Sequence, residues 1–496
     1  MSLLGIDIGT IGCKAVVFSL QGVQLARSYR DYEIISEREG YAELDSVEIW
    51  NKIKEAIREV AGQTQGDPIQ ALSVSSLGEA MVPVSQNRQI LGNSILGSDQ
   101  RGAEFAELIQ QKYSSSEIFR ITGNLPGTFY SMPKIGWIKK NRPDLYDQTK
   151  YFMTWADFVC FMLGGKPITN FSLAGRSLLF DIHSCKWSDE LFSLLGLDQS
   201  KFPDPLSSGY YLGNIDKHLA RELNLNSNVA IVSGSHDQCC AALGSGVKSG
   251  SKSAMYGMGT YMVVVPSFVQ MPDIQTMYTN KLHIEHHAVP GSFISFIYNQ
   301  SGGGMVKWFK QTFCMGIEPP TQDTSYSYDA IFAEMPDNST DILVLPGFGA
   351  TGPPDFENGG KGCIYGLSLN HSRGDILQAM LEGISFYFRD FFEDKNGAFT
   401  NVNYLTATGG GSVSKKWLQI TSDILGKPII RNKVSEASAL GAAIIAGIGI
   451  NVFTSFDEAI DSMVHQDLTI SPDFRKNEFY TEKFQRYKNQ VKQLKQ

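Results

Sequence analysis

The sequence predicts an α/β protein of two domains with a duplicated core, one copy in each half of the chain. Strand-like apolar runs alternate with amphipathic helical stretches, which is the pattern of an α/β fold. The 496 residues exceed the roughly 250–300 residues that a single hydrophobic core serves. A Gly-x-Gly-Thr-like turn between apolar runs occurs at Thr10 and again at Thr260, close to half a chain later.

The first half of the chain contains the first copy of the predicted duplicated core. Its expected strands are apolar or alternating runs, at 3–9, 15–20, 23–34 and 71–78. Helical periodicity predicts helices at 47–62 and 102–113. A strand, a glycine-rich turn and a small-residue helix then follow over 228–246. We place the domain boundary here, which gives domains 1–245 and 246–496.

The second half opens with a repeat of the N-terminal pattern at 251–267. Further glycine-rich elements follow at 299–310, 406–429 and 435–450. An Ala-Leu-Gly sequence occurs in two small-residue helices, at 242–244 and 439–441, and we expect these helices to pack closely at the domain junction. The charged stretch at 474–496 predicts an outer, solvated amphipathic helix.

The composition argues against two classes of partner. A net charge of −8 and a pI near 5.6 supply no basic surface for nucleic acid or anionic lipid. The seven cysteines lack Cys-x-x-Cys spacing, and no apolar run reaches the about 18 residues of a membrane span. We therefore expect a cytoplasmic protein with reduced thiols and with neither nucleic acid nor a membrane as partner.

The two glycine-rich turns have the composition of phosphate-binding loops. Glycines let an anion approach backbone amides and a threonine hydroxyl adds a donor, as at Gly9 and Thr10 and again at Gly259 and Thr260. An ordinary β-hairpin is the alternative for either turn alone. Asp7 would repel a phosphate unless a cation such as Mg²⁺ lay between them, which suggests a metal ligand. The alternative is that Asp7 caps the turn. The sequence contains no Gly-x-x-x-x-Gly-Lys-Ser/Thr loop, so a P-loop enzyme is excluded.

Asp237 lies where an apolar strand meets the small-residue helix. A carboxylate at this point can cap the helix N-terminus. It can equally accept the proton of a substrate hydroxyl during phosphoryl transfer. The position alone leaves both interpretations open.

Six segments, in the expected order, resemble the FGGY family of carbohydrate kinases within the superfamily of actin-like, sugar-kinase and chaperone ATPases. The first phosphate motif retains Gly5, Asp7, Gly9, Thr10 and Lys14. The two family signatures are similar to 129–141 and 362–382. The remaining segments are the catalytic-aspartate segment, the adenosine loop and the closing helix, at 234–246, 409–412 and 436–443.

The resemblance implies two actin-like (ribonuclease H-like) domains with an interdomain cleft that binds ATP and Mg²⁺. Asp237 would be the general base, Asp7 would hold Mg²⁺, and Lys14 belongs to the first nucleotide motif. The implied ATP contacts are Gly9, Thr10, Gly259 and Thr260 for the β and γ phosphates, Gly303 for the α phosphate, and Gly410, Gly411 and Ser412 for the adenosine.

The sequence departs from the family pattern at positions that the resemblance assigns to sugar binding. Gly78 and Glu79 stand where xylulose kinases usually carry Met-His and glycerol kinases Arg-Glu. Gly97 replaces a common tryptophan, which enlarges the pocket or changes its lid. Asp99 and Arg101 are retained. We expect Glu79 and Asp99 to accept hydrogen bonds from substrate hydroxyls, with surface carboxylates as the alternative.

Three other features remain open. His236 replaces a usual glycine, and turn capping is favoured over substrate contact. Trp155 and Asp157 either extend the pocket or pack in the core. The sequence HIEHH at 283–287 raises the question of a metal site, but a surface strand is favoured.

Together these observations predict ATP-dependent phosphorylation of a primary hydroxyl of a ketose such as xylulose, or of a related pentulose or polyol. The alternative substrates are glycerol-like polyols, sugar acids of the gluconate type and a quorum-signal precursor. A non-catalytic sugar or nucleotide sensor and a chaperone-like ATPase are the alternatives from other classes. The expected partner is a small sugar or polyol, and a homodimer is left open.

Overall fold

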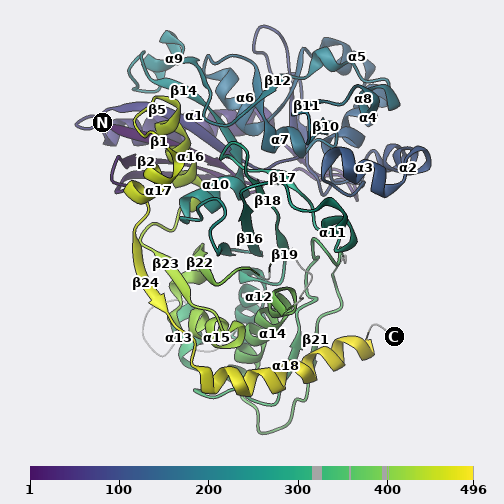
Figure 1. The fold of residues 1–496 in the computed structure, drawn as a ribbon. Coiled ribbons are helices and arrows are strands. Elements are labelled where there is room, and N and C mark those ends of the chain that lie inside the picture. The colour runs from purple at the N-terminus through teal and green to yellow at the C-terminus, as the bar shows by residue number, and fades with distance from the viewer. Residues whose placement is uncertain (315–326, 357–358, 394–398, 400, 495–496) are drawn as a thin grey trace.

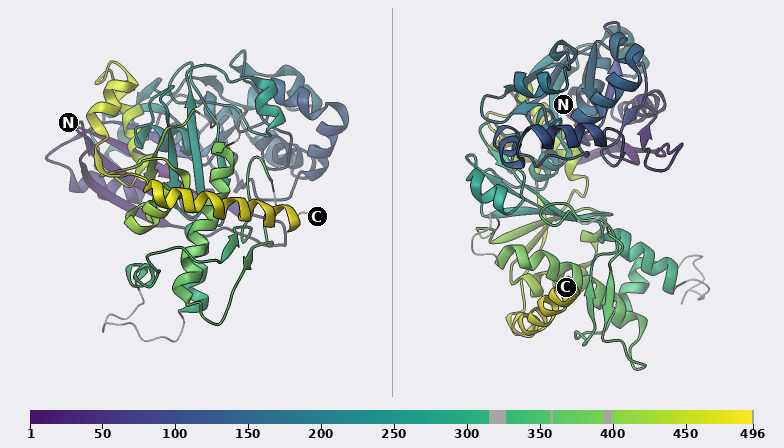
Figure 2. Two further views of the ribbon diagram at one scale, coloured as in Figure 1. Left: turned by 60° about the horizontal axis from the view of Figure 1, so that its bottom comes forward. Right: turned by 90° about the vertical axis from the view of Figure 1, so that its right-hand side faces the viewer.

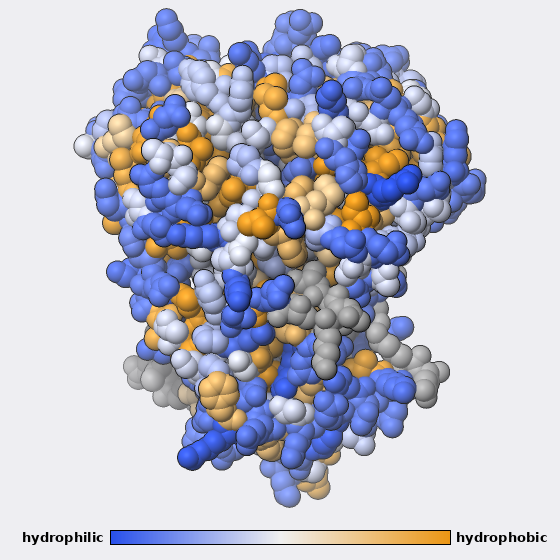
Figure 3. Space-filling model, in the orientation of Figure 1, coloured by the Kyte–Doolittle hydropathy of each residue, from blue (hydrophilic) through white to orange (hydrophobic). Residues whose placement is uncertain are grey.

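The computed structural model describes residues 1–314, 327–356, 359–393, 399 and 401–494. The chain forms two lobes joined by a narrower middle (Figures 1 and 2). The upper lobe of Figure 1 contains the N-terminal half, and most of the C-terminal half makes the lower lobe. The surface has a waist at the level where the lobes meet (Figure 3).

A six-stranded sheet forms the centre of the upper lobe, in the order β13-β14-β5-β1-β2-β3. β1 pairs antiparallel with β2 and parallel with β5, and β5 pairs parallel with β14. The strands are β1 (Ser2–Ile8), β2 (Gly12–Ser19), β3 (Gln24–Asp31), β5 (Ile69–Ser76), β13 (Tyr211–Asn214) and β14 (Ala230–His236).

The lower lobe contains an eight-stranded sheet in the order β17-β18-β16-β15-β22-β23-β24, with β19 also paired to β16. β15 pairs antiparallel with β16 and parallel with β22, and β22 pairs parallel with β23. The strands are β15 (Ser253–Met258), β16 (Met262–Phe268), β17 (Glu285–His286), β18 (Phe293–Ile294), β19 (Ile297–Asn299), β22 (Tyr404–Thr408), β23 (Ile429–Asn432) and β24 (Gln466–Ile470).

The two sheets share one topology. In each, an antiparallel hairpin is followed by two parallel strands on the same side of its first strand, and an antiparallel strand closes that edge. Thr10 lies in the hairpin turn of the first sheet and Thr260 in the equivalent turn of the second. The predicted α/β fold with a duplicated core is confirmed. The boundary after residue 245 stays a prediction.

Helices cover both faces of the first sheet. On one face lie α1 (Ser46–Gln63) and α6 (Trp155–Met162). On the other lie α10 (Asp237–Gly244), α16 (Ala437–Gly449) and α17 (Phe456–Met463). The C-terminal region of the chain therefore completes the upper lobe, as the yellow helices beside the N-terminal strands show (Figure 1).

The predicted close packing of the small-residue helices is confirmed. A Cβ added at Gly244 in α10 would lie 1.9 Å from the Ala437 carbonyl oxygen, and one at Gly441 in α16 would lie 1.9 Å from the Cys240 carbonyl oxygen. No side chain fits at either glycine, so the two helix backbones are in direct contact.

Smaller elements surround this framework in the upper lobe. The helices are α2 (Ala103–Lys112), α3 (Ser115–Thr122), α4 (Ser131–Asn141), α5 (Pro143–Gln148), α7 (Phe171–Gly175), α8 (Asp189–Leu194) and α9 (Lys217–Glu222), with a 3₁₀ turn η1 (Gln199–Lys201). The short strands are β4 (Glu43–Leu44), β6 (Met81–Val84), β7 (Ser94–Ile95), β8 (Tyr151–Thr154), β9 (Ile168–Asn170), β10 (Phe180–Asp181), β11 (Lys186–Trp187) and β12 (Asp204–Leu206).

The lower lobe packs its helices around one large apolar core. They are α11 (Ile274–Thr279), α12 (Gly303–Phe313), α13 (Tyr328–Ala333), α14 (Arg373–Glu393), α15 (Lys415–Leu425) and α18 (Phe474–Leu494), with η2 (Gly410–Val413) and the hairpin of β20 (Leu343–Leu345) and β21 (Cys363–Tyr365). The outer helix α18 buries Tyr480 and Phe484 against Phe386 of α14. Among the described residues, none of the helices has the length and apolar character needed to cross a bilayer.

Candidate active site

The parallel strands of the first sheet end at one edge, where the sequence places two carboxylates. Asp237 is the first residue of α10 and directly follows β14. Asp7 lies one residue before the end of β1, in register with Ser75 of β5. The carboxyl ends of parallel strands are the usual position of ligand sites in open α/β sheets. The fold thus brings the predicted base and the predicted metal ligand to the same edge.

Asp7 is held in a poorly hydrated position. Ser75 Oγ donates a hydrogen bond to its Oδ1 at 2.9 Å. Burial raises the pKa of Asp7 to about 6; the Lys14 ammonium opposes this rise, and the negative charge of Asp237 adds to it. A carboxylate in this setting is stabilised by any cation that reaches it, and carboxylate oxygen is a ligand that Mg²⁺ accepts. The residues present therefore fit the predicted metal role of Asp7.

Lys14 is paired within the protein. Its Nζ lies 2.7 Å from Oε2 of Glu436, which precedes α16, and Arg27 Nε lies 2.8 Å from the other oxygen of the same carboxylate. These contacts tie β2 and β3 to the start of α16. The nucleotide role of Lys14 stays a prediction.

The first glycine-rich turn is closed by its own backbone. The Gly9 amide donates to the Gly12 carbonyl at 2.9 Å, and Tyr32 Oη donates to the Gly9 carbonyl at 2.6 Å. Thr10 is exposed at the tip of the turn. The second turn is also closed by its own backbone but is one residue shorter, because the Gly259 amide donates to the Tyr261 carbonyl at 3.1 Å.

Helix α12 begins directly against the second turn. The Gly303 amide donates to the Gly259 carbonyl at 2.9 Å, and the Gly304 amide donates to the Thr260 carbonyl at 3.1 Å. A Cβ at Gly303 would lie only 2.7 Å from the Gly259 carbonyl oxygen. The predicted sites for the β, γ and α phosphates in the second half are therefore adjacent, at a helix N-terminus whose dipole favours anions.

The predicted adenosine loop also lies against the second turn. Gly409 has a φ of 87°, and a Cβ there would lie 3.0 Å from the Met258 carbonyl oxygen. Ser412 is buried and donates from Oγ to the Gly409 carbonyl at 2.6 Å, which folds the loop. Gly410 and Gly411 lie between them, and a Cβ at Gly410 would meet no atom within 4 Å.

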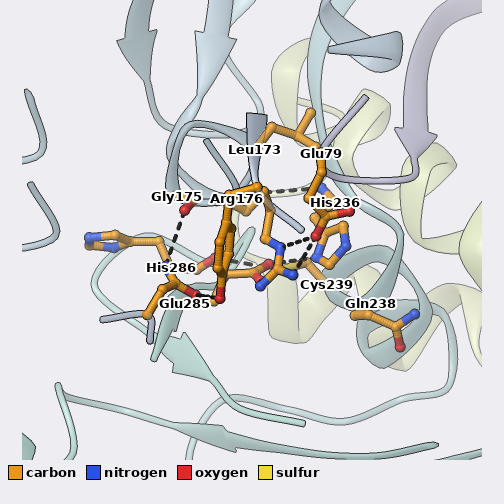
Figure 4. A network of polar contacts seen from close by, with 12 residues as sticks. Glu79, Leu173, Gly175, Arg176, His236, Gln238, Cys239, Glu285 and His286 are labelled. Carbon is orange, nitrogen blue, oxygen red and sulfur yellow. Dashed lines mark hydrogen bonds and ion pairs between the residues drawn. The ribbon is translucent and has the colours of Figure 1, made fainter. Parts of the chain in front are cut away.

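Glu79, a predicted sugar ligand, is paired with a residue that the sequence did not indicate. Arg176 follows α7 and donates from Nε to Glu79 Oε1 at 2.7 Å. The guanidinium carbon lies 5.3 Å from the ring centre of Tyr130 and 5.5 Å from that of Phe296. Figure 4 shows Arg176 between Glu79 and Glu285. No motif marked Arg176, because its partner is 97 positions away in the sequence.

Both glycines at which the chain departs from the family pattern make room for neighbouring side chains. A Cβ at Gly78 would lie 2.8 Å from Arg176 Cγ and 3.1 Å from His236 Nε2. A Cβ at Gly97 would lie 3.0 Å from Cδ2 of Phe129. The space left by the glycine at position 97 is therefore occupied by the Phe129 ring, which argues against the predicted enlargement.

Asp99 and Arg101 form an ion pair of their own. Asp99 is 1% exposed, which contradicts the alternative that it lies on a surface loop. Its Oδ2 accepts from Arg101 Nη2 and from the Ala42 amide, each at 2.6 Å, and Arg101 Nη1 lies 2.6 Å from Glu43 Oε1. A substrate hydroxyl would compete with these bonds, so this geometry favours a supporting role. Substrate contact by either residue stays a prediction.

The segment 283–287 is not on the surface, which corrects the expectation of a surface strand. His283, Glu285, His286 and His287 are all at most 8% exposed. Two of them have polar partners from elsewhere in the chain: Glu285 contacts His236, and His286 Nε2 lies 2.9 Å from the Ile182 carbonyl oxygen. The ring of His287 has no hydrogen-bond partner among the described residues, and the pKa of His283 and of His287 is lowered by burial, which favours neutral rings. Single-sequence patterns carry no signal for such distant partners.

Trp155 and Asp157 belong to the core. Trp155 is fully buried, and its Nε1 donates to Ser94 Oγ at 3.0 Å. Asp157 accepts from Thr154 Oγ1 at 2.5 Å, and burial raises its pKa to about 7. Of the two interpretations for these residues, core packing is the one that the structure supports.

Comparison with protein families accounts for both lobes. The N-terminal domain of the FGGY family of carbohydrate kinases matches residues 2–244, and the C-terminal domain of that family matches residues 274–450. The chain belongs to the FGGY family of carbohydrate kinases. It is therefore an enzyme that phosphorylates a carbohydrate with ATP, a reaction that generally needs a divalent metal.

Relatives of this FGGY kinase match over nearly their whole length. The xylulose kinase of Bacillus subtilis is 26% identical over 489 residues, which cover 98% of this chain and 96% of that protein. The glycerol kinase of Treponema denticola is 26% identical over 467 residues, covering 90% of each. A solved structure of a xyloylose kinase from Brucella ovis superimposes with a TM-score of 0.87 at 22% identity, covering 100% of this chain and 99% of that one. This likeness shows the two-domain actin-like fold.

Proposed function

We propose that this kinase transfers the γ phosphoryl group of ATP to a primary hydroxyl of an uncharged ketose, with xylulose or a related pentulose as the first candidate. The observation that carries the proposal is the position of Asp237. Its side chain is 28% exposed at the strand edge, it contacts His236, and its charge acts on Asp7. The name of the Bacillus subtilis relative supports xylulose over other ketoses.

In the proposed reaction Asp237 accepts the hydroxyl proton while the sugar oxygen bonds the γ phosphorus and ADP leaves. Gly9, Thr10, Gly259 and Thr260 hold the β and γ phosphates, Gly303 approaches the α phosphate, and Gly410, Gly411 and Ser412 contact the adenosine. Asp7 would hold Mg²⁺, which neutralises phosphate charge when bound. Closure of the lobes excludes water as a competing acceptor.

The charges around Glu79 support a neutral substrate over a sugar acid. Among the described residues beside Glu79 and Asp237, the cationic groups are Arg176 and His236, and both already face carboxylates. A sugar acid would need an unpaired cation to offset the cost of losing its hydration. The contacts on Glu79 from Arg176 involve Oε1, which leaves Oε2 to accept from a sugar hydroxyl.

The test is an ADP-release assay with ATP, Mg²⁺ and a panel of ketoses, polyols and sugar acids including xylulose, glycerol and gluconate. Sugar-dependent release with a ketose supports the proposal. Release only with sugar acids contradicts the neutral-substrate assignment. ATP turnover without sugar would indicate a chaperone-like ATPase, and sugar or nucleotide binding without turnover would indicate a sensor. The oligomeric state, measured by light scattering on the same sample, decides whether a homodimer forms.

A further inference from the structure

His236 bridges two carboxylates at the junction of β14 and α10. Its side chain is 6% exposed. Nε2 lies 3.2 Å from Oδ1 of Asp237, and Nδ1 lies 2.8 Å from Oε1 of Glu285. Figure 4 shows His236 in one polar network with Glu79, Arg176, Cys239 and Glu285.

This arrangement fits an imidazolium. A neutral ring carries one N–H, so one of its nitrogens would present a lone pair to a carboxylate, whereas the protonated ring can donate at both. Burial lowers the pKa of His236, but the negative charges of Glu285 and Asp237 outweigh burial and leave it raised. Burial raises the pKa of Glu285, and the His236 and Arg176 charges more than reverse this, to about 2.

The other titratable groups that face His236 keep a constant charge near neutral pH. Arg176 is held between Glu79 and Glu285 and disfavours the imidazolium. Burial and the Arg176 charge lower the pKa of His283 to about 3, so its ring is neutral. Cys239 Sγ donates to Glu285 Oε1 at 3.3 Å, and burial raises the pKa of this thiol, so it is also neutral.

We propose that His236 is a positioning residue for the catalytic base: anchored by Glu285, its imidazolium holds Oδ1 of Asp237 so that the other carboxylate oxygen faces the sugar hydroxyl. This inference rests on the proposed function, in which Asp237 is the base. As the sugar oxygen bonds the γ phosphorus and its bond to ADP breaks, the hydroxyl proton moves to Asp237. His236 keeps both of its protons throughout.

Two observations support this role. Gln238 Nε2 donates to the same Oδ1 at 3.0 Å, and no described residue donates to Oδ2, so one oxygen is fixed and the other is available. Gly78 has no side chain where a Cβ would lie 3.1 Å from His236 Nε2. The imidazole and the unusual glycine therefore fit together.

The contacts of His236, Cys239 and Glu285 favour the hydrogen-bonded network over a bound metal ion. Ligand atoms of His236, Cys239 and Glu285 lie within 4.8 Å of one another, which is compatible with a metal site. However, Arg176 Nη1 lies 3.7 Å from Oε2 of Glu285. A divalent ion would face this guanidinium and would have to break the His236–Glu285 hydrogen bond.

The first test is the pH profile of kcat at saturating ATP and sugar for the wild type, Glu285→Gln and His236→Gln. The imidazolium is present below its pKa and is lost as the pH rises through it, so it sets an alkaline limit to activity. Glu285→Gln removes the anion that raises the pKa, and the alkaline limb should move to lower pH by about 1 unit or more. His236→Gln should lower kcat about tenfold or more while leaving the KM for ATP within twofold.

The exposed His218→Gln is the matched control and should reproduce the wild-type profile. Superimposable profiles for Glu285→Gln and the wild type would overturn the proposal. So would a kcat for His236→Gln within twofold of the wild type.

A second readout does not depend on turnover. In ¹⁵N-histidine NMR spectra of the free protein, the signals lost in His236→Gln identify this ring among the eight histidines. The proposal expects an imidazolium that persists above the ordinary histidine range, and Glu285→Gln should lower its midpoint. A neutral ring at pH 6.5 in the wild type would overturn the proposal, even if Glu285→Gln fails to fold. If the His236 ring titrates as the proposal expects but the enzyme shows no sugar-dependent turnover, the proposed function is overturned instead.

Discussion

Arg176 and Glu79 form a buried ion pair that joins the end of α7 to the loop after β5, with Nε and Oε1 2.7 Å apart. The side chains of the two residues are only 6% and 9% exposed. Gly78, directly before Glu79, leaves the space that the Arg176 side chain occupies. The charge distribution of the proposed sugar site therefore depends on a residue that has no side chain.

Arg176→Met should destabilise the protein strongly, because it leaves two buried carboxylates, Glu79 and Glu285, without their guanidinium. Removing one partner of a buried ion pair typically costs about 3–5 kcal/mol. Urea denaturation monitored by circular dichroism measures the change in the free energy of unfolding. The double variant Arg176→Met with Glu79→Gln should recover part of the loss. Equal stability of the wild type and the single variant would argue against the pair.

Gly78→Ala should raise the KM for the sugar about 10- to 100-fold, because its Cβ would displace Arg176 and His236 from the proposed site. The KM for ATP should stay within twofold. Steady-state kinetics with each substrate varied in turn separate the two effects. Gly62→Ala is the control, since its Cβ would meet only one atom, at 4.0 Å. An unchanged sugar KM would remove Gly78 from the sugar site.

Gly303→Ala should weaken the binding of the nucleotide rather than that of the sugar. Its Cβ would press on the Gly259 carbonyl and separate α12 from the second turn. We expect the KM for ATP to rise about tenfold or more, with a smaller effect on the sugar KM. Isothermal titration with ADP gives the affinity directly. Gly66→Ala, where a Cβ meets no atom within 4 Å, should bind ADP as the wild type does; a Gly303 variant that matched it would contradict the phosphate role.

Asp237→Asn should lower kcat by about 10²–10⁴-fold, because an amide cannot take the hydroxyl proton. Nucleotide affinity should change little. The comparison variant is Asp216→Asn, which alters the carboxylate that caps α9. If Asp237 only stabilised the N-terminus of α10, both variants would lose some stability and both would keep their turnover. Quench-flow or coupled ADP assays distinguish these results.

Much of the fold was predictable because its signals are local. The turns at Thr10 and Thr260 each lie between two apolar strands, and their repetition indicated the duplicated sheets that the structure contains. The Ala-Leu-Gly helices were recognisable for the same reason, since small residues that permit contact between helix backbones are visible in the sequence itself.

The contacts around the predicted sugar ligands could not be foreseen as well, because the residues that make them are distant in the chain. Glu79 stays a predicted sugar ligand, and no sequence pattern indicated Arg176. The prediction that 283–287 forms a surface strand was wrong, because Glu285 is buried against His236 and Arg176. Asp99 was expected to offer free oxygens, yet Arg101 and the Ala42 amide use them. Long-range charge pairing leaves no periodic pattern that a single sequence could show.

The contact between α16 and the first sheet has a consequence during synthesis. β1, β5 and β14 are complete once about 236 residues have been made, but the helix that covers them begins only at Ala437. At translation rates of about 5–20 residues per second, this sheet waits roughly 10–40 seconds for its cover. A chain that ends before residue 437 would therefore expose most of one apolar face of this sheet, although α10 contacts part of that face and α1 and α6 cover the other.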